Sequence, residues 1–259
     1  MTRASARTTT SDPTIRADAR EPLFAYREAM HDFRIDPKTS ALVIVDLQYG
    51  SAGPEHGFAK AYRAIGYAEL LDVYLERIRD VVVPSVRRLL AAFRSAGAPV
   101  IFLTVGTIVG DLSDMPPRFR RAADHWRTLG IEPPYARVGT REMDVLDDIA
   151  PEAGDAWIVK TGASGFTASP LERVLWNRGV REIAFCGVAT AYCVESTLRD
   201  AADRGFDVVL VEDGCADVLP ETHDRGVKNC AAFGRVAGAD QLIDELRAGA
   251  RELEATGAR

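Results

Sequence analysis

Residues 41–47 read ALVIVDL, five consecutive apolar residues followed by an aspartate and a leucine. A short run this apolar is typical of a strand buried on both faces of a parallel sheet, because neither face alternates with polar residues. The carboxylate of Asp46 at the end of the run is costly to bury unless a charged or protic group meets it. The stretch therefore predicts an internal parallel strand whose carboxyl end carries a partnered carboxylate.

Similar apolar runs alternate with helical patterns along the chain. Further strands are expected at 98–105, 156–160, 182–188 and 206–213. Helices are expected at 68–96 (with a kink or a second start at Pro84), 170–179, 191–204, 220–232 and 239–252. This alternation favours right-handed crossovers around a parallel sheet. We therefore expect an α/β fold with three α/β/α layers and a central, mostly parallel, Rossmann-like sheet.

One segment does not show this alternation of strands and helices. Residues 106–140 contain four prolines and read as a long irregular excursion. Loops of that length in a compact domain usually serve as lids or subunit contacts. We expect one of these two roles here.

The length of 259 residues and the 47% hydrophobic content fit one α/β domain with a full core. We expect this domain to span 39–259. Residues 1–38 are expected to be a flexible N-terminal tail, of which 21–38 is a candidate arm onto a neighbouring subunit.

Charge and composition exclude several classes of protein. The net charge of −6 and the mixing of arginines with acidic residues argue against a nucleic-acid partner. No apolar run approaches the roughly 18 residues that span a bilayer, so we expect no membrane partner. The four cysteines have neither paired nor metal-ligand spacing. These features predict a cytoplasmic protein with free thiols.

Three ionisable side chains are expected at one edge of the sheet. Asp46 and Lys160 end two predicted strands, and Cys193 follows the strand 182–188 in the first turn of a helix. Because ligands bind outside the carboxyl ends of parallel strands, all three belong to the same edge. The positive end of a helix favours a thiolate, which makes Cys193 the best nucleophile candidate. Asp46 would take its proton, and Lys160 would balance the charge.

These residues stand in motifs that resemble those of the isochorismatase-like cysteine hydrolase superfamily. The resemblance covers about 38–246, and its motifs are VIVDLQ (43–48), KTGASGF (160–166), SPL (169–171) and GVATAYCVESTLRDA (187–201). They are most similar to the ureidoacrylate amidohydrolase and N-carbamoylsarcosine amidase type. The resemblance implies the isochorismatase-like hydrolase fold.

The resemblance also implies roles for individual residues. Asp46, Lys160 and Cys193 match the catalytic triad of the family. The Val188–Ala189 bond matches its cis peptide, and the N–H groups of Ala189 and Cys193 match its oxyanion hole. The implied reaction is hydrolysis of a C–N bond in a small amide, carbamoyl or ureido compound. It would proceed through a thioester and release ammonia or an amine.

This chain differs from some members of the family at individual positions, and these differences affect the expected cofactor and substrate. Residues 104–114, at the end of the second strand, contain none of the histidines that metal-binding nicotinamidases carry after this strand, so we expect neither a metal nor another cofactor. Tyr49 stands where many relatives have asparagine. Vinyl-ether hydrolysis of the isochorismatase type and a non-catalytic role in binding a metabolite are the alternatives. The resemblance and the N-terminal arm indicate a homo-oligomer, either a dimer or a tetramer.

The sequence says least about which residues contact the substrate. The candidates flank the motifs of the triad: Gln48, Tyr49, His56, Phe166 and Tyr192. Each aromatic residue among them could equally belong to the core. If the substrate carries a carboxylate, Arg118, Arg120 and Arg121 are the candidate partners.

Overall fold

The computed structural model describes residue 26 and residues 29–256. The chain divides into two compact units, Met1–Phe33 and Arg34–Arg259. Most of the expected tail and arm therefore lies outside the described residues. Ile35 belongs to the second unit, where it is buried and its N–H donates to Glu245 Oε2 at 3.2 Å.

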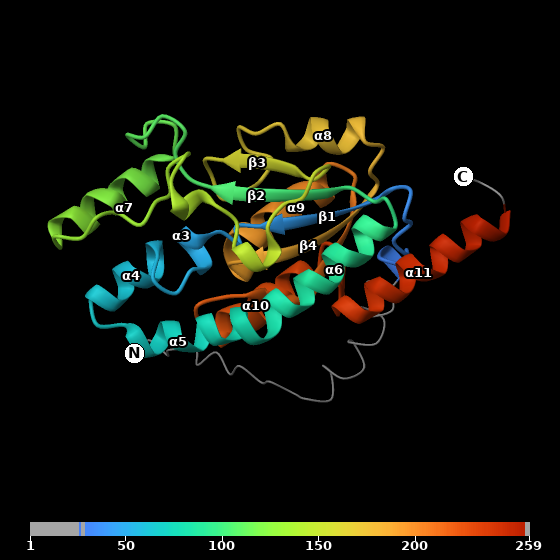
Figure 1. Ribbon diagram of the computed structural model, residues 1–259, viewed down its shortest axis with the longest axis horizontal. Helices are drawn as coiled ribbons and strands as arrows, with labels where there is room; N and C mark the ends of the chain where they lie inside the picture. The colour runs from blue at the N-terminus through green and yellow to red at the C-terminus, as the bar shows by residue number, and fades with distance from the viewer. Residues whose placement is uncertain (1–25, 27–28, 257–259) are drawn as a thin grey trace, which may run out of the picture. The chain divides into compact units, whose positions relative to one another are not determined.

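A six-stranded sheet in the order β3-β2-β1-β4-β5-β6 forms the centre of the second unit (Figure 1). Its strands are β1 (Ser40–Val45), β2 (Val100–Val105), β3 (Ala156–Lys160), β4 (Glu182–Val188), β5 (Asp207–Ala216) and β6 (Arg235–Ala237). Every pairing is parallel. The α/β fold with a parallel central sheet is confirmed, and β6 is a short edge strand that the sequence did not predict.

Helices cover both faces of the sheet. The α-helices are α3 (Tyr49–Ala52), α4 (Gly57–Ala64), α5 (Ala68–Arg77), α6 (Val83–Ser95), α7 (Pro117–Thr128), α8 (Leu171–Asn177), α9 (Glu195–Asp203), α10 (Pro220–Cys230) and α11 (Ala239–Thr256). The π-helical turns are η1 (Ile78–Val82) and η4 (Thr190–Val194), and the 3₁₀ turns are η2 (Arg141–Met143) and η3 (Asp147–Ile149). Helices α6 and α11 pack together on one face, and α8 lies on the other (Figure 1).

The helical stretch from α5 to α6 is interrupted where a kink or a second start was expected. The π-helical turn η1 lies between the two helices, and Pro84 is in the first turn of α6. Helical backbone runs through η1 into α6, and the shifted hydrogen-bond register of the π-helical turn accommodates the N–H group that proline lacks.

The expectation of an irregular excursion over 106–140 was wrong in part. Helix α7 occupies twelve residues of it, and its buried residues are Phe119, Ala123 and Trp126. Their spacing of four and three residues is that of one helical face. Flanking prolines and the charged residues between them obscured this pattern in the sequence.

The strand order places a binding site at the carboxyl end of β1. This strand lies between β2 and β4, and the connections from β1 to β2 and from β4 to β5 run in opposite directions across the sheet. Ligands of open α/β sheets bind at such a reversal, outside the carboxyl ends of the strands. Gly187 is required here, because a Cβ at this position would lie 2.0 Å from the carbonyl oxygen of Val45.

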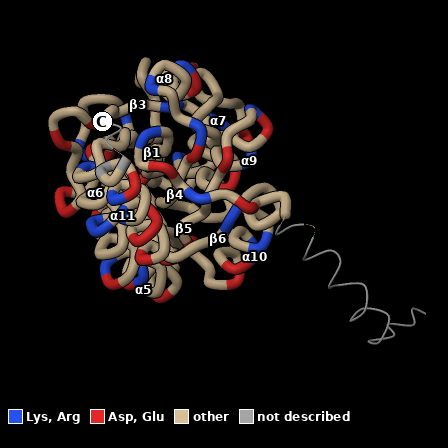
Figure 2. Tube along the Cα trace, turned by 90° about the vertical axis from the view of Figure 1, so that its right-hand side faces the viewer, with Lys and Arg blue, Asp and Glu red and all other residues tan. Residues whose placement is uncertain are grey.

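The surface carries charges of both signs. Figure 2 shows lysines and arginines interspersed with aspartates and glutamates along the chain. Over residue 26 and residues 29–256, no helix is both long and apolar enough to cross a membrane.

Candidate active site

The three ionisable residues expected at one edge of the sheet lie at the ends of β1, β3 and β4. Asp46 follows β1 directly, and Lys160 is the last residue of β3. Cys193 lies in η4, the turn that follows β4. Asp46 has a φ of 53°, a left-handed conformation that is uncommon for a residue with a side chain. Such backbone strain is concentrated at functional sites.

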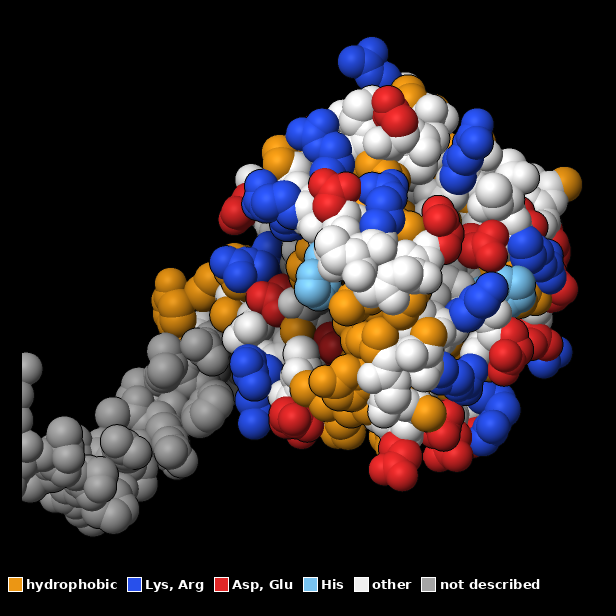
Figure 3. Space-filling view, turned by 90° about the vertical axis from the view of Figure 1, so that its left-hand side faces the viewer, with side chains coloured by type: hydrophobic (Ala, Val, Ile, Leu, Met, Phe, Trp, Pro, Cys, Tyr) orange, Lys and Arg blue, Asp and Glu red, His pale blue; other side chains and the backbone are white. Residues whose placement is uncertain are grey.

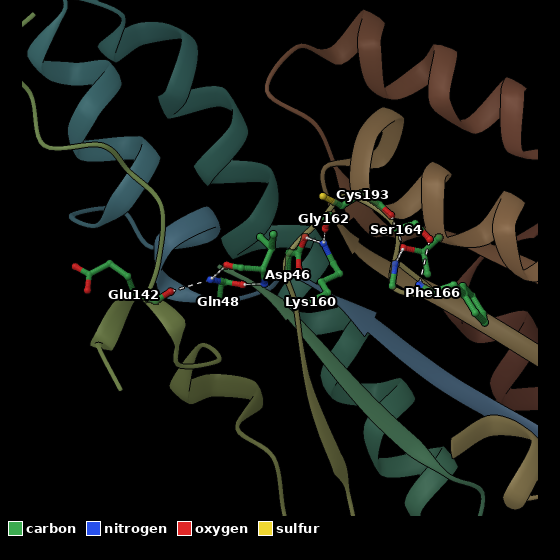
Figure 4. A network of polar contacts seen from close by, with 11 residues as sticks. Asp46, Gln48, Glu142, Lys160, Gly162, Ser164, Phe166 and Cys193 are labelled. Atoms are coloured by element: carbon green, nitrogen blue, oxygen red, sulfur yellow. Dashed lines mark hydrogen bonds and ion pairs between the residues drawn. The ribbon is translucent and has the colours of Figure 1, made fainter. Parts of the chain in front are cut away.

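Lys160 and Asp46 form a buried ion pair (Figure 4). Lys160 Nζ donates to Asp46 Oδ2 at 2.8 Å and to the carbonyl oxygen of Gly162 at 3.0 Å. Neither side chain is more than 2% exposed. Burial is the largest single influence and lowers the pKa of Lys160, but the charges and hydrogen bonds of Asp46 and Cys193 together outweigh it. The net shift is therefore upward, and the ammonium keeps its proton.

The second oxygen of the Asp46 carboxylate is free to accept a proton. Asp46 Oδ1 is buried and has no hydrogen bond of ordinary geometry from the described residues. The Cys193 side chain is near enough to interact with this carboxylate. Burial raises the pKa of Asp46 above its ordinary value, although Lys160 opposes the shift. A carboxylate with a raised pKa is a better base for a thiol.

The environment of Cys193 differs from the sequence expectation. A helix N-terminus was expected to favour the thiolate, but the residue lies in a π-helical turn and is 6% exposed. Burial raises the pKa of the Cys193 thiol to about 12, although the Lys160 charge opposes this shift. The loss of water around the sulfur is the largest influence and the charge of Asp46 adds to it, so the thiol form is favoured.

Polar contacts fix the turn that carries Cys193. The Thr190 hydroxyl lies 2.8 Å from His223 Nδ1, and the N–H of Ala191 donates to Asp217 Oδ2 at 2.9 Å. The Thr197 hydroxyl donates to the carbonyl oxygen of Cys193 at 2.7 Å. The peptide bond between Val188 and Ala189, just before the turn, is cis.

The contacts of His223 also define its protonation state. Arg77 Nη2 lies 2.9 Å from His223 Nε2, and a guanidinium can only donate. Nε2 is therefore the acceptor, and Nδ1 carries the proton toward Thr190. Burial and the Arg77 charge lower the pKa of His223 to about 4. The imidazole is thus neutral at pH 7.

A cavity of about 330 Å³ opens beside these residues. It is lined by Asp46, Gln48, Gly50, Ser51, Phe58, Ala59, Tyr62, Leu71, Tyr74, Val105, Phe119, Pro134, Tyr135, Ala136, Val188, Ala189, Tyr192, Cys193 and Val218. Figure 3 shows the face of the molecule that carries α4 and α7, with hydrophobic side chains gathered around a hollow. The volume lies at the lower end of the range of about 300–1,000 Å³ for small-molecule sites.

Two of the expected substrate residues belong to the cavity wall. Tyr192 is 44% exposed, and its hydroxyl accepts from Arg118 Nε at 3.2 Å. Gln48 is buried, and its amide group donates to the carbonyl oxygens of Val105 and Glu142, both at 3.0 Å. Its oxygen accepts from the N–H of Val105 at 2.6 Å. Gln48 therefore braces the cavity wall, with both amide hydrogens already donated.

The other three expected substrate residues lie outside the cavity wall. His56 Nδ1 is 3.5 Å from Glu142 Oε1, and the Tyr49 ring lies under the guanidinium of Arg141 at 3.9 Å. Phe166 points away from the Lys160–Asp46 pair (Figure 4) and packs against Phe206 with 6.3 Å between ring centres.

Sequence reasoning missed most of the aromatic wall. Phe58 and Tyr62 come from α4, which was not expected, and Phe119 comes from α7 in the supposed irregular segment. The sequence feature that could have indicated this wall is the density of aromatic residues over 58–74 and 119–135. Over the described part of the chain, no three His, Cys, Asp or Glu side chains gather as a metal site would require.

Comparisons with known proteins agree with this architecture. The sequence model described as the isochorismatase domain matches residues 40–241. Ureidoacrylate amidohydrolase RutB of Caulobacter vibrioides is 30% identical over 196 residues, which cover 72% of this chain and 81% of that protein.

Solved structures show the same fold. A cysteine hydrolase from Pseudomonas syringae aligns with a TM-score of 0.69 at 24% identity, covering 85% of this chain and 97% of that one. N-carbamoylsarcosine amidase from Thermoplasma acidophilum aligns with a TM-score of 0.55 at 24% identity, covering 78% of this chain and 97% of the other. The chain belongs to the isochorismatase family of hydrolases.

Proposed function

We propose that this protein is a cysteine-dependent amidohydrolase that cleaves a C–N bond of a small amide, carbamoyl or ureido compound. The observation that carries the proposal is the buried Asp46 carboxylate, which interacts with the Cys193 side chain. Lys160 holds its Oδ2, and its Oδ1 has no hydrogen bond of ordinary geometry from the described residues. The relative from Caulobacter vibrioides, named as an amidohydrolase, supports the same bond type. Cys193 is the nucleophile, Asp46 the base and Lys160 the counter-charge.

The first half of the reaction forms a thioester. Asp46 Oδ1 takes the thiol proton of Cys193 as the sulfur attacks the carbonyl carbon of the substrate. Lys160 keeps its proton and stabilises the negative charge that moves between carboxylate and sulfur. The C–N bond then breaks, and the proton held by Asp46 passes to the leaving nitrogen.

The second half hydrolyses the thioester. Asp46 accepts a proton from water, whose oxygen attacks the carbonyl carbon, and the sulfur leaves as the thiol with that proton. In both halves the N–H groups of Ala189 and Cys193 would bind the developing oxyanion. Their place in the cavity wall beside Asp46 supports this role.

The test is ammonia release from a panel of ureido acids, carbamoyl amino acids, alkylureas and simple amides. For a confirmed substrate, Cys193→Ala should lower kcat at least about 1,000-fold while the circular dichroism spectrum is unchanged. Cys230→Ala is the matched control, because Cys230 is a buried cysteine of α10 outside the cavity wall. It should retain most of the activity.

The alternatives make different predictions in the same experiment. A vinyl-ether hydrolase and a metabolite-binding protein would both release no ammonia from any compound, and the vinyl-ether hydrolase would cleave a vinyl ether even in Cys193→Ala. Mass spectrometry of Asp46→Asn after mixing with substrate adds a second measurement. We expect the acylated mass to be absent, because no base takes the thiol proton.

A further inference from the structure

Four aromatic rings from three parts of the chain form one wall of the cavity. We call this wall, made of Phe58, Tyr62, Phe119 and Tyr135, the aromatic box. Tyr135 contacts Phe58 and Phe119 edge to face, with ring centres 5.9 Å and 5.5 Å apart. Phe58 and Tyr62 are 6.4 Å apart. These spacings are those of favourable aromatic packing, so the rings hold one another in place.

A second layer supports the aromatic box. Trp126 of α7 meets Tyr62 edge to face at 5.6 Å, and Phe119 belongs to a buried cluster with Leu112, Met115 and Ala123. Burial raises the pKa of Tyr135 to about 12, which keeps its phenol uncharged. The box is therefore a preformed, apolar surface.

Charge in the cavity is confined to the catalytic end. Asp46 is the one carboxylate among the described residues of the wall, and Lys and Arg are absent from that set. The Lys160 ammonium is already paired with Asp46. A substrate carboxylate inside the cavity would face a like charge and find no free cation, which is unfavourable in a buried site.

One arginine contacts the cavity wall at Tyr192. Arg118 is exposed, donates to the Tyr192 hydroxyl and lies over the Phe119 ring at 4.7 Å. Arg118 is not part of the cavity wall, so the cation nearest this part of the box lies outside the wall, against Phe119 and Tyr192.

We infer that the natural substrate is an amide or ureide that carries an uncharged aromatic group, which fills the aromatic box while the carbonyl lies beside Cys193. This inference rests on the proposed function for the bond that is cleaved. It excludes short anionic ureido acids as good substrates, because they would leave the box unfilled and bury their carboxylate without a partner.

Three ureides with the same carbamoyl group test the inference: benzylurea, methylurea and 3-ureidopropionate. Their dissociation constants are measured by calorimetry on Cys193→Ala, so that binding is read independently of turnover. Benzylurea should bind at least about 30-fold more tightly than either other compound, because it alone buries a ring. Equal affinities, or tighter binding of 3-ureidopropionate, would overturn the inference.

Variants of the box locate the effect. Phe119→Ala should weaken benzylurea binding at least about tenfold and methylurea binding less than twofold. Phe119→Leu, which keeps apolar packing in the cluster, should give an intermediate value even if the alanine variant folds poorly. Leu129→Ala is the control, since Leu129 is 47% exposed just after α7 and should change neither constant. Equal loss for both ureides in the two Phe119 variants would contradict a ring in the box.

The two proposals fail in different ways. If the wild-type enzyme releases ammonia from methylurea and 3-ureidopropionate as efficiently as from benzylurea, the amidohydrolase assignment stands and the aromatic specificity is wrong. If benzylurea binds selectively but no amide or ureide is hydrolysed, the box stands and the proposed reaction is wrong.

Discussion

The side chain of Lys160 reaches Asp46 across the end of the strand between them. Lys160 ends β3, Asp46 follows β1, and β2 separates these strands in the sheet, yet Nζ and Oδ2 are 2.8 Å apart. Both side chains are buried. Each charge is therefore acceptable in the interior only because the other is present.

This dependence predicts how the pair responds to substitution. Lys160→Met should lower the free energy of unfolding by about 3–5 kcal/mol, because it leaves a buried carboxylate without a partner. The double variant Lys160→Met/Asp46→Asn should be more stable than Lys160→Met and still inactive. Urea unfolding followed by circular dichroism measures both. Lys228→Met, at an exposed position of α10, should change stability by less than about 0.5 kcal/mol. A double variant no more stable than Lys160→Met would contradict the pairing argument.

The raised pKa of Asp46 predicts the acid limb of the pH–rate profile. The proposed mechanism needs the carboxylate form, so kcat/KM falls as the pH drops through the pKa of Asp46. Burial raises that pKa above its ordinary value, so the limb lies at a higher pH than an exposed aspartate would give. Initial rates between pH 4 and pH 8 check this, with circular dichroism at each pH to show that the protein stays folded. A kcat/KM that is constant down to pH 4 would be inconsistent with Asp46 as the base.

Much of this site could be predicted from the sequence, because few arrangements are open to a buried parallel strand. The run ALVIV fixes β1 in the interior, and strands of one parallel sheet end at one edge. Asp46 and Lys160 had to form an ion pair there, because burying either charge alone would be energetically unfavourable. Only Gln48 and Tyr192 of the five expected substrate residues line the cavity.

The rest depends on packing between segments far apart in the sequence. Phe119 faces the cavity only because α7 folds over it, and flanking prolines hid that helix. The pKa of Cys193 depends on how deeply its turn is buried, which its neighbours in sequence do not specify. His223 stands in none of the sequence motifs, and only the fold brings Arg77 and Thr190 to its two ring nitrogens.

The neutral state of His223 predicts a pH dependence of stability. Its folded pKa of about 4 lies below the ordinary 6.5, so the unfolded chain binds more protons between these values. The stability from neutral His223 is complete above about pH 6.5 and is lost as the pH falls toward 4. Arg77 opposes protonation and Asp224 favours it, and Arg77 is the stronger influence.

Urea unfolding at pH 7, 5.5 and 4.5 measures the slope of the unfolding free energy against pH. His223→Asn should show a smaller loss of unfolding free energy across the range than the wild-type protein. His125→Asn, at an exposed position of α7, is the matched control and should keep the wild-type slope. Parallel slopes for the wild type and His223→Asn would rule out this histidine as the source.

Thr197 joins the two segments that carry Cys193 and Lys160. Its hydroxyl donates to the carbonyl oxygen of Cys193 at 2.7 Å and accepts from the N–H of Gly165 at 3.0 Å. Thr197→Val keeps the shape but removes the acceptor, leaving the buried Gly165 N–H unsatisfied. The free energy of unfolding should fall by about 1–3 kcal/mol.

Thr197→Ser separates the hydroxyl from the methyl group. Serine keeps both hydrogen bonds and loses only packing, so it should be the more stable variant in urea unfolding and retain more of the amidase kcat. Valine preserves packing better than serine does, so an effect of packing alone would reverse this order. A valine variant at least as stable and as active as the serine variant would therefore show that the hydroxyl bridge does not position the turn that carries Cys193.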